Sequence, residues 1–188
     1  LAKAREETGL PIVPELLSQD QAELVAEYSD MLQIGTRNAQ NFQLIIAAAK
    51  TGKPVLLKRG MSMRIMEWLL AGEYVLANRN PNLLFCERGI RTFEDYTRNT
   101  LDLSAVAVVK AESHCPIVVD PSQGCGKASL VRSMCKGAVA VGADALLVEG
   151  HPNPTEAISD AAQQIDLEGF AALIDELAPI AESVGREI

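Results

Sequence analysis

The stretch Lys53-Pro54-Val55-Leu56-Leu57-Lys58-Arg59-Gly60 contains the pattern that decides the fold of this chain. A short apolar run at 55–57 follows a proline and ends in two cations, and a helix-length segment at 65–77 comes next. Short apolar runs bounded by turn residues are typical of buried strands in a parallel sheet. Because parallel strands need a crossover between them, the helix-length segment is the expected connection.

The same unit of apolar run and helix-like segment recurs along the whole chain. Six runs have this form, at 11–16, 31–35, 54–57, 82–86, 116–119 and 145–148. Helices are expected at about 19–29, 38–50, 65–77, 129–141 and 167–184, with the end of a helix at 1–8 and a short helix or irregular segment at 105–110. Ser18 is the expected N-cap of the helix at 19–29, and Gly9 is expected to end the helix at 1–8. The alternation predicts an α/β fold with a parallel sheet, either a barrel or a doubly wound sheet.

Composition excludes several classes of protein. The 188 residues are 48% hydrophobic and carry a net charge of −8, which disfavours a nucleic-acid partner because phosphate backbones require a basic surface. No apolar segment approaches the roughly 18 residues of a membrane span, so a cytoplasmic protein without membrane contact is expected. Four cysteines without a CxxC pair are expected to be buried or incidental thiols rather than disulfides.

Charged residues follow the ends of the predicted strands. They are Arg37, Lys58, Glu87 with Arg88, Asp120, and Glu149 with His151. In a parallel barrel the carboxyl ends of the strands form one rim, which carries the chemistry. Arginine forks and a lysine on one rim suit a small anionic substrate.

Each of these signals also has a structural alternative. Lys58 could equally pair with a neighbouring carboxylate, and the arginines around Glu87 could form a salt-bridged loop. Glu149, His151 and Asp160 offer oxygen and imidazole ligands for a divalent ion, but taken singly they favour a solvated histidine and a capping aspartate. The segment 120–127 does not meet the P-loop pattern, and no GxGxxG follows a predicted strand.

Five motifs that occur in a fixed order along the chain give a more specific indication of its family. They are Leu-Leu-Lys-Arg-Gly-Met at 56–61, Cys-Glu-Arg-Gly-Ile-Arg-Thr-Phe-Glu at 86–94, Thr-Arg-Asn-Thr-Leu-Asp-Leu at 97–103, Val-Asp-Pro-Ser at 119–122 and Glu-Gly-His-Pro-Asn-Pro at 149–154. This set resembles the class I DAHP synthases (3-deoxy-7-phosphoheptulonate synthases) of the short microbial type. The resemblance implies a TIM (β/α)8 barrel and a homo-oligomer, either dimer or tetramer. It also implies the condensation of phosphoenolpyruvate with erythrose 4-phosphate, the first step of the shikimate pathway to aromatic amino acids.

The resemblance also implies roles for individual residues. Arg37 and Arg88 would bind the phosphate of phosphoenolpyruvate, with Arg59 as a supporting charge. Lys58 and Glu87 would be catalytic, Lys58 at the carboxylate and the reacting carbons and Glu87 near the attacking water.

A divalent metal of the Mn, Fe, Zn or Co class is implied in the same way. Glu149 and Asp160 match two of its ligands, and Gln123 is the candidate third. Gln123 stands where the family has histidine, which predicts weakened or absent metal binding because an amide is a poorer ligand than imidazole. Thr36 replaces the alanine of the family's Gly-Ala-Arg.

The resemblance accounts for six of eight βα units. We therefore expect residues 1–188 to form a single domain, the carboxyl-terminal three-quarters of a barrel, without the first two strands and their aldose-phosphate loop. Little condensation is expected from such a chain alone. Two alternatives stay open, the related 3-deoxy-manno-octulosonate 8-phosphate synthase and a non-catalytic or repurposed paralogue, the latter favoured by Gln123.

Overall fold

The computed structural model of the protein describes residues 1–187. These residues form two compact units, the first ending at Cys86 and the second beginning at Glu87. Both units alternate strands with helices, and every paired strand is parallel. The expected α/β fold with parallel strands is confirmed.

The first unit contains three strands and their helices. In chain order the elements are α1 (Ala2–Thr8), η1 (Gln19–Gln21), α2 (Ala22–Glu27), β1 (Leu32–Ile34), η2 (Thr36–Asn38), α3 (Phe42–Lys50), β2 (Val55–Lys58), α4 (Ile65–Ala77) and β3 (Leu83–Glu87), whose last residue opens the second unit. The register places Leu32 beside Val55, and Val55 beside Leu83. The carboxyl ends of β1 and β2 therefore lie at the same edge.

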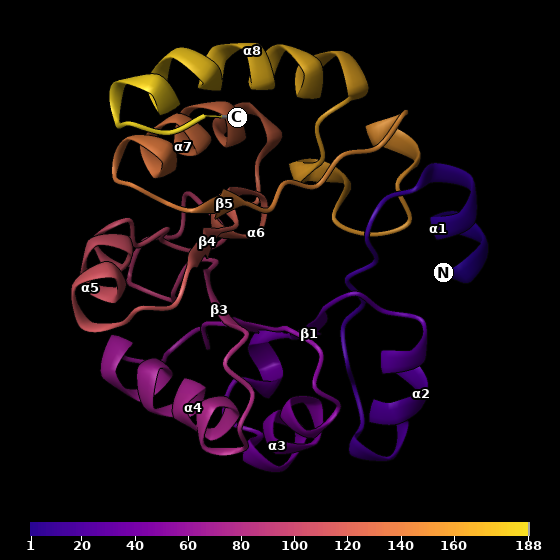
Figure 1. Ribbon diagram of the computed structural model, residues 1–188. Helices are drawn as coiled ribbons and strands as arrows, with labels where there is room; N and C mark the ends of the chain where they lie inside the picture. The colour runs from indigo at the N-terminus through magenta and orange to yellow at the C-terminus, as the bar shows by residue number, and fades with distance from the viewer. Residues whose placement is uncertain (188) are drawn as a thin grey trace. The chain divides into compact units, whose positions relative to one another are not determined.

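The core of the first unit lies under α3 and α4, which run side by side (Figure 1). Trp68 in α4 is fully buried, and its indole ring meets the ring of Phe85 edge-on at 5.0 Å between centroids. The indole Nε1 donates to the carbonyl oxygen of Leu57 over 3.1 Å. This bond satisfies the one polar atom of the ring and joins α4 to the strand that carries Lys58.

The described part of the second unit contains two strands and the longest helix, α8. Its elements are α5 (Ser104–Glu112), β4 (Ile117–Val119), α6 (Pro121–Cys125), α7 (Ala128–Ala140), β5 (Ala145–Leu146), η3 (Pro154–Glu156), η4 (Ala161–Gln163) and α8 (Leu167–Ser183). The N–H of Asp120 donates to the carbonyl oxygen of Glu87 over 2.8 Å. The ends of β3 and β4 therefore lie together within this unit.

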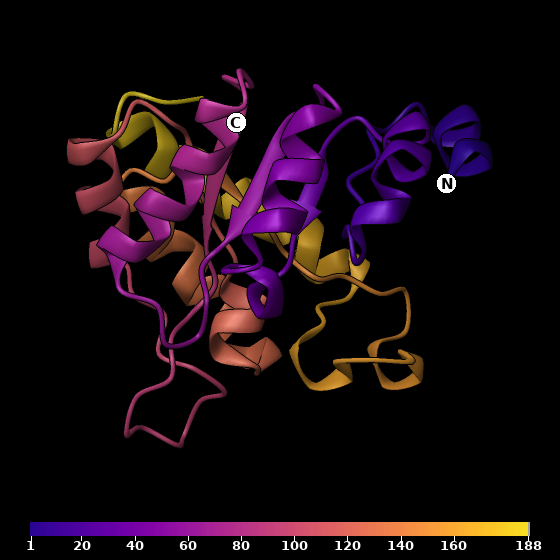
Figure 2. The ribbon, with the colours of Figure 1, turned by 90° about the horizontal axis from the view of Figure 1, so that it is seen from below.

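The core of the second unit forms between α7 and α8. Cys135 in α7 packs with Leu173 and Leu177 in α8, and all three are buried. The loop that contains residues 91–95 projects from the second unit (Figure 2), with the ring of Phe93 fully exposed. All four cysteines are buried and free, as the sequence predicts.

Two segments at the amino end differ from the sequence-based expectations. The run 11–16 is not a strand, because it pairs with β1 only through the isolated bridge between Glu15 and Gln33. Pro11 and Pro14 lack the N–H groups that a longer ladder needs. The helix expected at 19–29 is a 3-10 turn followed by the short α2, and the Ser18 side chain does not cap it but bonds to Asp20.

The remaining elements lie close to their expected positions. The helix at 65–77 is found with those bounds, and it begins with the Glu67 carboxylate accepting from the Arg64 N–H over 2.8 Å. Gly9 ends α1 with a φ of 69°, the left-handed conformation that glycine adopts most easily. Within residues 1–187, no helix has the length and apolarity that a membrane crossing requires.

Candidate active site

Two buried cations stand at the carboxyl end of β2. Lys58 is the last residue of the strand and is 9% exposed, and Arg59 is 4% exposed. The Arg59 backbone N–H donates to the carbonyl oxygen of Cys86 over 2.9 Å, which extends the pairing of β2 with β3. Its side-chain Nε donates to the Met63 carbonyl, and its guanidinium lies 5.8 Å from the Trp68 ring centroid. Arg59 is therefore fixed in place by the core of the first unit.

The end of the neighbouring strand β1 carries Arg37. Ile34 and Leu57 are register partners, so Arg37 and Lys58 follow the ends of adjacent strands. Arg37 lies in the 3-10 turn η2 and is exposed. Thr36 brings its hydroxyl into this turn, and the Oγ1 atom is buried without a hydrogen-bond partner.

Glu87 and Arg88 form the corresponding edge of the second unit. Both are buried, and the Glu87 carboxylate accepts from the Gly89 N–H over 2.6 Å. Gly89 has a φ of 89°, and a Cβ there would come within 2.7 Å of Asn99. Only glycine suits this position, so the backbone turn that orients Glu87 depends on it.

Gln123 joins Arg88 to two carboxylates. Its Oε1 accepts from the Arg88 guanidinium over 3.2 Å. Its Nε2 donates to Glu149 Oε1 over 2.6 Å and to Asp160 Oδ2 over 3.1 Å. The structure thus brings together the three residues expected around the metal.

Two further residues complete this cluster, and sequence reasoning assigned neither of them a role. Gln163 is 2% exposed and donates from Nε2 to Glu149 Oε2 over 3.0 Å. Arg98 donates to Asp160 Oδ1 over 2.8 Å and to Gln163 Oε1 over 2.9 Å. Arg98 belongs to a recognised motif and could have been singled out, but Gln163 lies in a short loop helix where the sequence gives no signal.

Asp160 has an unusual backbone conformation for a residue with a side chain. Its φ is 53°, in the left-handed region that aspartate tolerates better than most residues. Partial burial raises the pKa of Asp160, but hydrogen bonds from Gln123 and Arg98 and the charges of Arg98 and Arg88 outweigh it and hold the pKa below its usual value. The carboxylate is therefore ionised at neutral pH.

The donor set does not fit a divalent metal. Among residues 1–187, no group of three or more His, Cys, Asp and Glu side chains could hold a metal ion. Gln123 turns its NH2 group, which cannot ligate a cation, toward the two carboxylates. His151 is no substitute, because its Nδ1 accepts from the N–H of Asn153 within its own loop.

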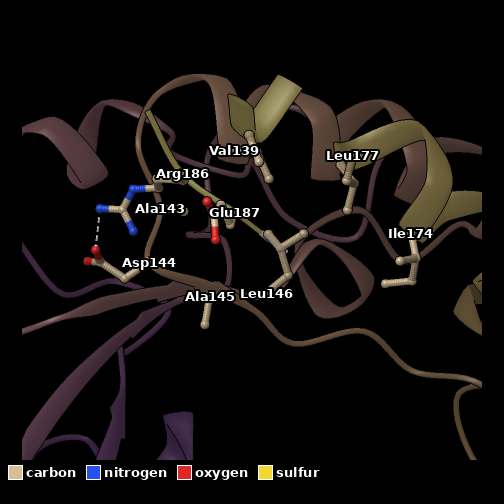
Figure 3. Close-up of a pocket in the computed structure, with 10 residues that line it drawn as sticks. Val139, Ala143, Asp144, Ala145, Leu146, Ile174, Leu177, Arg186 and Glu187 are labelled. Atoms are coloured by element: carbon tan, nitrogen blue, oxygen red, sulfur yellow. Dashed lines mark hydrogen bonds and ion pairs between the residues drawn. The ribbon is translucent and has the colours of Figure 1, made fainter. Parts of the chain in front are cut away.

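A pocket of about 550 Å³ lies elsewhere in the second unit (Figure 3). Leu146 of β5 and Ile174 and Leu177 of α8 form its apolar wall, and Arg186 and Asp144 pair at its margin. None of the site residues predicted from the sequence lines it. The residues expected to carry the chemistry lie at the strand ends and not in this pocket.

Comparison with known proteins identifies the family of the chain. The chain has an α/β fold with charged residues at its strand ends. The model of the DAHP synthetase I family matches residues 1–183, and the chain belongs to that family.

Several relatives show how close the similarity is. The chain is 47% identical over its full length to a phospho-2-dehydro-3-deoxyheptonate aldolase of Thermotoga maritima, and it spans 56% of that protein. It is 33% identical over 96% of its length to a 2-dehydro-3-deoxyphosphooctonate aldolase of Syntrophotalea carbinolica, of which it covers 68%.

Solved structures give the same result. A truncated form of 3-deoxy-D-arabino-heptulosonate 7-phosphate synthase from Thermotoga maritima matches with a TM-score of 0.96 at 47% identity, over 99% of this chain and 71% of that one. A second structure, of phospho-2-dehydro-3-deoxyheptonate aldolase (DAHP synthase) from the same organism, matches with a TM-score of 0.97 at 48% identity, over 100% and 55%.

Proposed function

We propose that the protein carrying this chain is a DAHP synthase, which condenses phosphoenolpyruvate with erythrose 4-phosphate in the shikimate pathway. Two observations carry the proposal: a buried cation at or just past a strand end in each unit, Lys58 at the end of β2 and Arg88 after β3, and 47% identity to a relative of that name. The proposal includes a cytoplasmic homo-oligomer, either dimer or tetramer.

The residues at the strand ends suit the two charged groups of phosphoenolpyruvate. Arg37 and Arg88 bind its phosphate, because guanidinium groups form paired hydrogen bonds with phosphate oxygens. Lys58 binds the carboxylate, and Arg59, held by Met63 and Trp68, adds positive charge beside it. Holding both charged ends fixes C3 of the enol for attack.

The condensation then follows from the chemistry of the two substrates. C3 of phosphoenolpyruvate forms a bond to the aldehyde carbon of erythrose 4-phosphate, and the aldehyde oxygen takes a proton to become a hydroxyl. Water adds at C2 with loss of a proton, for which the Glu87 carboxylate is the nearby base. The C2 hydroxyl then loses its proton to form the ketone as the C2–O bond to phosphate breaks, and the phosphate takes up that proton and leaves.

The test is the consumption of phosphoenolpyruvate by the purified full-length protein that carries this chain, with erythrose 4-phosphate in one arm and arabinose 5-phosphate in the other. Turnover with the four-carbon sugar is expected. Preference for the five-carbon sugar would support the octulosonate alternative, and silence in both arms would support a non-catalytic paralogue.

A pair of lysine variants tests the assignment of residues. Lys58→Met removes the buried cation and should lower kcat/KM by at least about 100-fold, since a charged hydrogen bond to substrate is worth about 3 kcal/mol. Lys50→Met removes an exposed lysine at the end of α3 and should leave activity unchanged. Equal activity of the two variants would contradict the role of Lys58.

A further inference from the structure

The two carboxylates at the edge of the second unit are fully supplied with hydrogen-bond donors. Glu149 accepts at Oε1 from Gln123 and at Oε2 from Gln163. Asp160 accepts at Oδ1 from Arg98 and at Oδ2 from Gln123. Each of the four carboxylate oxygens therefore has one N–H partner within the protein.

Both glutamine amides are oriented by an arginine. The Oε1 of Gln123 accepts from Arg88, and the Oε1 of Gln163 accepts from Arg98. Each amide thus links a guanidinium on its oxygen side to a carboxylate on its nitrogen side. Two positive and two negative side chains balance each other, so the cluster has no excess negative charge to attract a cation.

Metal ligation by Gln123 requires the opposite orientation of its amide. The Oε1 atom would have to turn toward Glu149 and Asp160, because an amide nitrogen does not ligate a metal ion. That rotation directs the NH2 group at the Arg88 guanidinium, donor against donor, and breaks the bonds to both carboxylates. A histidine can offer a ring nitrogen to a metal, whereas Gln123 in this setting offers only hydrogens.

We propose that Gln123 is a positioning residue that holds Glu149 and Asp160 together in a cluster without a metal ion. In this cluster the Gln123 amide bridges the two carboxylates, and Gln163 donates a further hydrogen bond to Glu149. Glutamine at this position, where the family has histidine, then replaces the metal ion by hydrogen bonds. The inference rests on the same strand ends as the proposed function, and its primary test is metal binding rather than activity.

The direct test is a titration of ¹⁵N-labelled protein with Mn²⁺ and then with Zn²⁺, followed through the side-chain amide signals of Gln123 and Gln163. We expect no selective broadening of these signals by Mn²⁺ and no shift with Zn²⁺. Selective broadening by Mn²⁺, or a Zn²⁺-dependent shift of the Gln123 amide, would overturn the proposal. This measurement needs no variant to fold.

Two variants sharpen the test. Gln123→His should bind Zn²⁺ at least about tenfold more tightly than the parent protein in calorimetry, because it restores a ring nitrogen beside two carboxylates. Gln164→His adds a histidine nearby but outside the cluster, at a residue whose amide contacts Ser159, and should not tighten binding. Equal Zn²⁺ affinity of parent and Gln123→His would refute the argument.

The activity assay, repeated with a chelator, separates this inference from the proposed function. Condensation that persists in chelator supports both. If no condensation is observed and no metal is bound, the proposed function is wrong and the proposed metal-free cluster is supported. Condensation that requires an ion bound beside Glu149 overturns the cluster and leaves the function in place.

Discussion

Asp144 joins three separate elements of the second unit, and its removal should weaken that unit in a pH-dependent way. Oδ1 accepts from Lys110 Nζ over 2.9 Å and from Arg186 NH2 over 2.6 Å. Oδ2 accepts from the backbone N–H of Ile117 at the start of β4 over 2.8 Å. The side chain is only 22% exposed, so these bonds are partly shielded from water.

Two substitutions at this position separate the backbone bond from the ion pairs. Asp144→Ala leaves the N–H of the buried residue Ile117 without its acceptor, which costs about 1–3 kcal/mol. It also breaks two partly exposed ion pairs, each worth about 0–1 kcal/mol. Asp144→Asn keeps an oxygen for the Ile117 N–H and loses only the ion pairs. The free energy of unfolding should therefore fall by about 1–5 kcal/mol in the alanine variant and by at most about 2 kcal/mol in the asparagine variant.

The pH dependence follows from the pKa of the carboxyl group. Burial raises the pKa of Asp144, but the bonds from Ile117, Lys110 and Arg186 outweigh it and hold the pKa below its usual value. A lowered pKa in the folded state contributes stability above the unfolded-state pKa of about 3.9, and this contribution is lost as the pH falls through the folded-state value. Parent and Asp144→Asn should therefore differ at pH 7 and converge in acid.

Urea unfolding followed by circular dichroism at several pH values measures these differences. Hydrogen exchange of the Ile117 amide gives a local readout, which should accelerate in Asp144→Ala and much less in Asp144→Asn. The reasoning is refuted if the two variants are equally stable at pH 7, or if the gap between parent and Asp144→Asn stays constant down to pH values well below 4.

Three further outcomes test the packing around the site. Gly72→Ala should destabilise the first unit by about 1–3 kcal/mol in urea unfolding, since a Cβ there would lie 2.5 Å from the Phe85 ring, and unchanged stability would count against this packing. Cys135 should react with iodoacetamide only after unfolding, because burial raises the pKa of its thiol to about 12, and fast labelling of native protein, located by mass spectrometry, would contradict this. Binding of phosphoenolpyruvate should change the fluorescence of Trp68, the only tryptophan, because Arg59 lies over its indole ring. Trp68→Phe should abolish this change. If the parent protein binds phosphoenolpyruvate without a fluorescence change, the proposed coupling between Arg59 and Trp68 is wrong.

The order of strands and helices was largely readable from the chain. The strand at 55–58 and the helix at 65–77 follow from a short apolar run and a longer amphipathic segment, both local patterns. The predicted strand at 11–16 does not form, and the cause is equally local. Pro11 and Pro14 interrupt the hydrogen-bond ladder that an apolar run would otherwise form. The helix α6 was not predicted because its five residues are too short for a helical period to show, although Asp120 at its N-cap and the following Pro121 are local signals of a helix start.

The sequence by itself determined that Lys58, Arg88 and Glu149 lie at or just beyond strand ends, because the carboxyl end of a parallel strand is a position that a one-dimensional pattern can mark. Tertiary structure alone decided what surrounds them. The direction in which the Gln123 amide points depends on Arg88, which is 35 residues away along the chain, and on carboxylates contributed by later loops. Hydrogen bonds between residues so far apart produce no pattern in the sequence. In the sequence, Gln123 therefore indicates only the loss of a metal ligand, whereas in the folded chain it lies at the centre of a charge-balanced cluster.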